Sequence, residues 1–476
     1  MNAERRAQNV EWRKAARGRR FFLNSTFCAL RSAFKLLALL AALALLVAAK
    51  RRAVGIGATV PELSRQRSFA ISDTAILSAF TFERVLAQLA ARSGVTGATA
   101  EGLYRQWWDT QNPRPGRDAA MPHCDDELTN GKPSHNGFPR RCPTAEGVLA
   151  NEPYRPEDFF AIAITNRFDL ADANGAHCGQ YRIVFAHRNE PPAEPLHIIF
   201  EGALANPNPA AGLAGCRPVA QFWADLSAVG SVDERRLRLE RFFFDGITGF
   251  APVVDPAHYR HAPAGIRTLQ SRAGSQRFYQ FRIITENGRL IMKPDVLENL
   301  PFDRLFDASV PGERGERFRA ELLRNVSTLS TRDVNLYHMA IPAEFLMVES
   351  DPDVGDDEPA FIYSIPFNRS LNSSAGLAFR EAILTELQTS GSALVPEKII
   401  MRAETQNCVG CHSIRGDVGD GVTFPPSLGN NQHVSDIEVA AGRFGISRAM
   451  EEVFIPHRMQ ILREFLQSGK APVHSN

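Results

Sequence analysis

The stretch Tyr181-Arg182-Ile183-Val184-Phe185-Ala186-His187 decides which class of fold this chain can adopt. Tyr181, Ile183, Phe185 and His187 alternate with Arg182 and two smaller residues. Because successive side chains of a β-strand point to opposite faces, this alternation is typical of a half-buried strand. Half-buried strands belong mainly to antiparallel sheets, since parallel sheets are covered on both faces. The stretch therefore predicts an antiparallel sheet.

The sequence on either side adds strands and helices in mixed order. Further β-type runs lie at 159–165, 196–202, 278–285, 289–294 and 361–366. Glu286-Asn287-Gly288 separates two of these runs, and Asn-Gly is a strong hairpin signal. Helical patterns occur near residues 82–89, 104–108, 220–228, 232–244, 317–329 and 374–391. This order predicts an α+β domain over residues 67–394 and argues against a doubly wound parallel sheet.

The first 66 residues are expected to form a basic leader, a signal or anchor helix and a linker. Residues 36–49 are an uninterrupted run of Leu, Ala and Val. Fourteen apolar residues fit a signal-peptide core better than a full membrane span, which needs about 17–25. The basic Lys50-Arg51-Arg52 argues against cleavage directly before it and makes a short anchor equally plausible. Either way the rest of the chain is exported, and we expect a periplasmic protein anchored to the inner membrane by residues 36–49.

The cysteines agree with export. Cys28 lies in the leader, and Cys124, Cys142, Cys178 and Cys216 form a group upstream of the last two. Sequential pairing, Cys124–Cys142 and Cys178–Cys216, would clamp two loops rich in Pro and Gly, and disulfides form in oxidising compartments. Four unpaired buried thiols are the alternative. The formal net charge of +1 gives no reason to expect a nucleic-acid partner.

The last two cysteines lie in Cys408-Val409-Gly410-Cys411-His412. The C-x-x-C-H spacing places two thiols about one helical turn apart, as covalent attachment of one haem c requires. His412 follows directly, so that its imidazole can ligate the iron. The motif occurs once in the chain, which predicts a single covalently bound haem with Cys408, Cys411 and His412 as its binding residues.

With the Gly- and Pro-rich stretch after His412 and an amphipathic helix beginning near Pro456, this region resembles the small c-type cytochrome domain. The resemblance covers roughly residues 395–470 and implies a small all-α domain over 395–476. It also implies a second axial ligand downstream. We favour Met450; His433, Met459, His457 or an open position are the alternatives. Residues 67–394 resemble only an uncharacterised exported bacterial domain.

These observations predict an exported, membrane-tethered mono-haem c-type cytochrome that transfers single electrons to redox partner proteins of the cell envelope. One alternative is an oxidoreductase or peroxidase-like enzyme in which the α+β domain works with the haem. Another is a haem-based redox or gas sensor, and zinc at the Cys-Cys-His motif is a further alternative.

Three other groups of residues admit a functional and a structural interpretation. His123-Cys124-Asp125-Asp126 with His135 could bind a metal or form a disulfide-bridged loop. Asp169, Asp172, Asn174 and Gly175 resemble a calcium loop in the wrong register, and a plain turn explains them better. Trp107 and Trp108 could line a site, but packing of a helix is the favoured interpretation.

Overall fold

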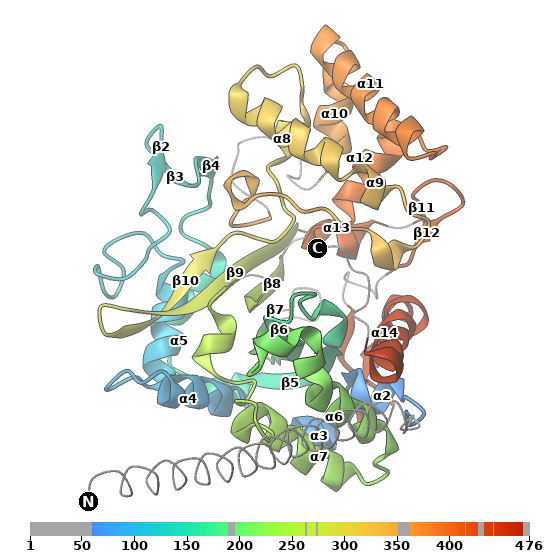
Figure 1. Cartoon of the computed structure of the whole chain (residues 1–476). Helices are drawn as coiled ribbons and strands as arrows, with labels where there is room; N and C mark the ends of the chain where they lie inside the picture. The colour runs from blue at the N-terminus through green and yellow to red at the C-terminus, as the bar shows by residue number, and fades with distance from the viewer. Residues whose placement is uncertain are drawn as a thin grey trace, which may run out of the picture. The chain divides into compact units, whose positions relative to one another are not determined.

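The structure is a computed structural model, and it describes residues 60–188, 196–261, 264–272, 275–350, 362–414, 416–426, 433–440 and 442–469. Contacts group Val60–Asn476 into one unit. Its centre is a seven-stranded antiparallel sheet in the order β1-β5-β6-β7-β8-β9-β10 (Figure 1). The strands are β1 (Ala70–Ile71), β5 (Phe159–Arg167), β6 (His177–His187), β7 (Leu196–Ala205), β8 (Gly265–Arg272), β9 (Ser275–Glu286) and β10 (Arg289–Asp295).

The predicted strand and hairpin are both confirmed. Residues 181–187 lie in β6, which pairs antiparallel with β5 and β7. Asn287 and Gly288 connect β9 to β10, with φ angles of 51° and 71°, and Glu286 pairs with Arg289. Two consecutive positive φ angles are what a tight hairpin turn needs, and Asn and Gly tolerate them best.

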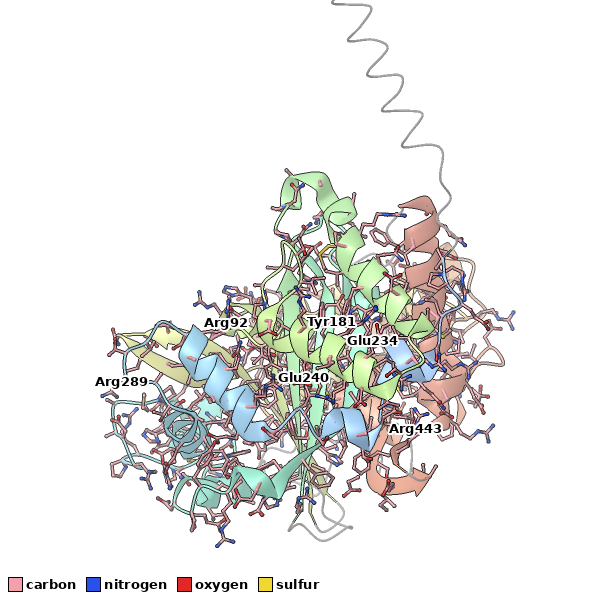
Figure 2. All side chains as sticks on the ribbon, turned by 90° about the horizontal axis from the view of Figure 1, so that it is seen from below. Arg92, Tyr181, Glu234, Glu240, Arg289 and Arg443 are labelled. Carbon is pink, nitrogen blue, oxygen red and sulfur yellow. A yellow bond between two sulfur atoms is a disulfide. The ribbon has the colours of Figure 1, made fainter. Side chains whose placement is uncertain are left out.

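One face of the sheet packs against a helical layer and forms the first hydrophobic core. The layer includes α4 (Phe82–Arg92), α5 (Ala100–Asp109), α6 (Arg217–Ala228) and α7 (Val232–Glu240). Figure 2 views the molecule from the side of these helices. Tyr181 points into this core and stacks on Trp223 of α6, with ring centroids 5.4 Å apart. Trp107 and Trp108 are fully buried in the same core, so the packing interpretation of this pair is confirmed.

A second hydrophobic core lies beyond β9. It is built by α8 (Glu313–Arg324), α9 (Val326–Leu329), α10 (Ser364–Ser370), α11 (Ser374–Thr389) and α12 (Pro396–Glu404). The strand predicted at 361–366 is wrong: Ser364 begins α10, and Phe361 lies outside the described residues. Pro366 falls in the first turn of α10, where a proline removes no helical hydrogen bond.

The predicted fold class is wrong at the C-terminus, which is not a small all-α domain. After α13 (Cys408–Ser413), the chain forms two hairpins. They are β11 (Gly416–Asp417) with β12 (Thr423–Phe424), and β13 (Val434–Ala440) with β14 (Arg443–Ile446). A π-helical turn, η11 (Ala449–Phe454), then leads into α14 (Ile455–Ser468).

The physical reason is that the C-terminal segments bury their apolar side chains in two different cores. Val409 of α13 belongs to the second core. Phe465 of α14 belongs to the first core, where its ring centroid lies 4.9 Å from that of Phe168. The Arg217 guanidinium also donates a 2.8 Å hydrogen bond to the carbonyl oxygen of Leu466. The region therefore shares the cores of the upstream sequence.

Both disulfides have the sequential pairing that the sequence favours. Cys124 is bonded to Cys142 and Cys178 to Cys216, with Cα–Cα distances of 5.4 and 5.2 Å. The signal or anchor helix expected at residues 36–49 lies outside the described residues. Within the described part of the chain, every helix is too short or too polar to cross a membrane.

Candidate functional site

The short helix α13 carries the C-x-x-C-H motif and is held at both its N-terminus and its middle. The Asn407 side chain accepts a 2.6 Å hydrogen bond from the Gly410 backbone N–H and donates one of 2.9 Å to the Tyr363 hydroxyl. Such a side-chain cap satisfies an N–H group that the helix itself leaves unpaired. Gly410 lies so close to the preceding helix that a Cβ here would be 1.8 Å from the Glu404 carbonyl oxygen. Position 410 therefore has no room for a side chain unless the backbone shifts.

Cys408, Cys411 and His412 all line one large cavity of about 990 Å³. The cavity lies between α13 and the face of the central sheet that turns away from the first core. β5 to β9 contribute to its lining, and η11 and α14 contribute Met450, His457 and Arg458. Pockets for organic ligands usually measure about 300–1,000 Å³, so this one has room for a large cofactor. In Figure 1, α13 lies between the sheet and the helices of the second core.

The two motif cysteines are the free thiols of the described residues. The Cys408 sulfur lies 3.5 Å from the Arg267 guanidinium, and the Cys411 sulfur lies 3.9 Å from Nε2 of His433. Burial raises the pKa of both thiols, that of Cys411 to about 12. Both sulfurs are therefore protonated at neutral pH in this environment.

His412 lies against two rings. Its ring centroid is 4.5 Å from that of His433 and 5.5 Å from that of Phe278 on β9. Nδ1 of His433 lies 3.1 Å from the Ser447 hydroxyl, while its Nε2 faces the motif. Burial, followed by the charge of His412, lowers the pKa of His433 well below its ordinary value. His433 is thus a neutral imidazole at pH 7.

The four residues considered as second axial ligand separate into two groups. Met450, His433 and His457 line the cavity. Met459 packs against the first core instead. The backbone N–H of Met450 donates to the Ser447 hydroxyl at 3.2 Å, so Ser447 contacts both Met450 and His433.

Sequence reasoning missed the charged residues on the cavity face of the sheet. These are Arg167, Arg182, Glu201 and Arg267, with Asp169 after β5 and Arg458 on α14. The signal was present in the alternation around Arg182, but that face of the strand was expected to meet solvent. The C-terminal region covers it, and the side chain of Glu201 is only 1% exposed.

The other candidate groups have structural partners. Cys124 is in a disulfide, and the ring nitrogens of His123 lie 3.2 and 3.1 Å from the carbonyl oxygens of Asn112 and Asp118. Asp169 pairs with Arg167, and the Asp172 carboxylate accepts a hydrogen bond from the Asn174 N–H within a turn. In the described ranges, no three or more His, Cys, Asp or Glu side chains converge as a metal site would require.

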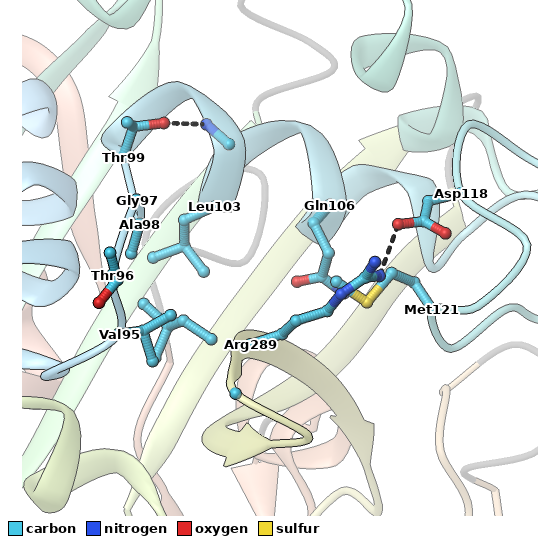
Figure 3. A pocket seen from close by; sticks show the side chains of 13 residues that line it. Val95, Thr96, Gly97, Ala98, Thr99, Leu103, Gln106, Asp118, Met121 and Arg289 are labelled. Atoms are coloured by element: carbon cyan, nitrogen blue, oxygen red, sulfur yellow. Dashed lines mark hydrogen bonds and ion pairs between the residues drawn. The ribbon is translucent and has the colours of Figure 1, made fainter.

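A smaller cavity of about 250 Å³ lies between residues 95–106 and the β9–β10 turn (Figure 3). An ion pair of 2.7 Å between Arg289 and Asp118 borders it. Its lining includes neither cysteine nor histidine. The free thiols and the imidazole of His412 line the larger cavity instead.

Comparison with protein-family models, curated proteins and solved structures finds no match for this chain. Function must therefore be inferred from the cavity and its residues. Two free thiols on one helical turn, with a histidine directly after them, are the donor set of a covalently bound haem. Nε2 of the buried His197 also lines the cavity side of the sheet and has no hydrogen-bond partner among the described residues. The donor set and the space both fit such a group.

Proposed function

We propose that this chain is an exported mono-haem c-type cytochrome that transfers single electrons. The observation that carries the proposal is the joint placement of Cys408, Cys411 and His412 at one cavity of sufficient size. The other four cysteines of the described residues form two disulfides, so only the two motif cysteines are free there. The disulfides also favour an oxidising compartment. There the protein would exchange electrons with redox partner proteins of the cell envelope.

Cys408 and Cys411 would hold the haem by two thioether bonds. Each of these bonds would join one cysteine sulfur to a vinyl group of the haem. His412 would provide an imidazole ligand from the same helix. When bound, the haem supplies one-electron chemistry at its iron. The protein's own residues orient it and limit water: α13 is capped by Asn407, and Phe278 packs beside His412.

If the iron takes a second ligand from the protein, the contacts favour His433 over Met450. A ligating histidine usually donates its other ring N–H to a nearby acceptor, which fixes its orientation. The Ser447 hydroxyl lies 3.1 Å from Nδ1 of His433, where it could accept such a hydrogen bond, and Nε2 faces the motif. Met450 lines the same cavity and is the second choice.

An alkaline pyridine haemochrome spectrum of the purified chain, produced together with a c-type maturation system, tests the proposal. We expect a c-type band that survives denaturation and precipitation. A Cys408→Ser/Cys411→Ser variant should lose covalent haem, whereas Cys124→Ser/Cys142→Ser should keep its motif thiols and hence the haem. A wild-type chain without the band would refute the proposal.

Carbon monoxide separates the carrier from the enzyme or sensor alternatives. With His433 or Met450 on the iron, the reduced native protein should bind carbon monoxide only slowly or not at all. Rapid binding would indicate an open position, as a peroxidase-like enzyme or a gas sensor requires.

A further inference from the structure

Two carboxylates that line the cavity, Asp169 after β5 and Glu201 on β7, each lie between two arginines. Asp169 pairs with Arg167 at 2.8 Å and with Arg458 at 3.9 Å. Glu201 pairs with Arg182 at 3.0 Å and with Arg267 at 2.9 Å. All six side chains line the 990 Å³ cavity.

This cluster has an excess of positive charge. Four guanidinium groups face two carboxylates, which leaves two charges uncompensated within the cluster. Glu298, which pairs with Arg267, is 45% exposed, and Asp172 is half-buried, so solvent screens both. Burying unpaired charge is costly, and proteins retain it mainly where a ligand supplies the opposite charge.

Arg458 shows where the compensation is missing. The residue is only 9% exposed, and its ion pair with Asp169 is long, at 3.9 Å. That distance is too long for a hydrogen bond. Burial, followed by the charge of Arg167, lowers the pKa of Arg458 to about 9, so it is still a cation at neutral pH. A buried, charged guanidinium whose paired carboxylate lies beyond hydrogen-bond distance points to a ligand with anionic oxygens.

We propose that Arg167, Arg182, Arg267 and Arg458 bind a doubly charged anion with carboxylate or phosphate-like oxygens. Such oxygens form charge-assisted and often bidentate hydrogen bonds with guanidinium groups. The anion has two possible sources. It is either the pair of carboxylates on the haem itself, in which case the inference rests on the proposed function, or a free small oxyanion that occupies the cavity beside the haem.

Calorimetric titration with inorganic phosphate at pH 7.5 and constant ionic strength tests this site. It is carried out on the haem-loaded chain and on the haem-free Cys408→Ser/Cys411→Ser variant, whose folding is checked by circular dichroism. Arg458→Gln should weaken phosphate binding by roughly 10- to 100-fold, the effect of losing one charge-assisted contact. Arg458→Lys should weaken it less. Arg238→Gln, on the opposite side of the sheet in α7, should leave it unchanged.

The two forms distinguish the sources. If only the haem-free chain binds phosphate, the carboxylates of the haem occupy the arginines in the loaded chain. If the haem-loaded chain also binds phosphate, the arginines form a site for a free oxyanion. In the first case, Arg458→Gln should also lower the midpoint potential of the loaded chain, because a cation near the haem is lost. The proposal is overturned when Arg458→Gln matches Arg238→Gln in phosphate binding and in midpoint potential. If the chain never carries haem, the proposed function is refuted. The anion site is then judged only by whether Arg458→Gln weakens phosphate binding.

Discussion

Ser447 contacts both His433 and Met450, the two residues proposed as a second ligand of the iron. Its hydroxyl lies 3.1 Å from Nδ1 of His433 and accepts a hydrogen bond from the Met450 backbone N–H. This contact orients the imidazole of His433, whereas for Met450 it restrains only the backbone. A side chain held in this way needs less reorganisation to ligate a metal.

We therefore expect His433→Ala to change the axial ligation of the haem, while Met450→Leu leaves it intact. The His433→Ala protein should become high-spin in its ferric form and bind carbon monoxide rapidly when reduced. Absorption and electron paramagnetic resonance spectra of both variants measure this. The opposite result, a ligation change in Met450→Leu alone, would assign the position to Met450.

Glu349 is a second residue whose environment makes a measurable prediction. It is fully buried, and its carboxylate accepts a hydrogen bond from the Arg141 backbone N–H. Burial raises the pKa of Glu349 from 4.5 to about 7, against the opposing effects of Arg141 and Arg140. The folded state therefore binds this proton more tightly than the unfolded state does.

Because the folded-state pKa is raised, the free energy of unfolding should fall as pH rises from about 4.5 to about 7. The contribution of this group is on the order of 3 kcal/mol, at 1.36 kcal/mol per pKa unit. Glu349→Gln should remove this part of the pH dependence, and Glu381→Gln, at an exposed position of α11, should not. Urea unfolding at pH 5 and pH 8 measures both. An unchanged pH dependence in Glu349→Gln would contradict the assignment.

At the scale of elements, α13 depends on the absence of a side chain at Gly410. The position is helical, so Gly is not needed for its φ angle; it is needed for the close approach to the Glu404 carbonyl oxygen. Any Cβ here would force α13 away from α12. The thiols of Cys408 and Cys411 would then move relative to the cavity.

Gly410→Ala should lower the free energy of unfolding by about 1–3 kcal/mol, the usual cost of overpacking, and should reduce covalent haem incorporation. Gly230→Ala is the matched control, since a Cβ there meets no atom within 4 Å. Chemical denaturation and the haemochrome yield test both variants. Equal stability of the two would show that α13 can relax without loss.

Some features of the sheet could be predicted from local sequence patterns, and others could not. The alternation in residues 181–187 and the Asn287-Gly288 turn predicted β6 and the β9–β10 hairpin, because strand period and turn geometry are local properties. The same alternation suggested one solvated face. That expectation failed because α13, η11 and α14 cover the face, and contacts between residues so far apart in the chain leave no local signal.

At the scale of the whole molecule, the C-terminal region depends on the upstream chain. Its apolar residues are divided between two cores, each built mainly by residues before 395. Phe465 and Leu466 pack in the core of the central sheet, and Val409 packs with α8 to α12.

A fragment of residues 395–476 should therefore not fold by itself. We expect it to show no cooperative unfolding by circular dichroism and no stable haem environment, in contrast to the full chain under the same conditions. In the full chain, Phe465→Ala should cost about 3–5 kcal/mol, as for a fully buried aromatic ring. A fragment that folds cooperatively would restore the expectation of an independent cytochrome domain.

By itself, the sequence determined the antiparallel strand pattern, the hairpin and the three residues of the motif, and it favoured the sequential disulfide pairing that the structure contains. The strand pattern, the hairpin and the motif depend on spacing and on side-chain chemistry over a few residues. Only the tertiary structure decided that the C-terminal region shares two cores with the rest, and that four arginines of the sheet and α14 face the motif across one cavity. Both results follow from long-range burial of apolar and charged side chains, which no local pattern encodes.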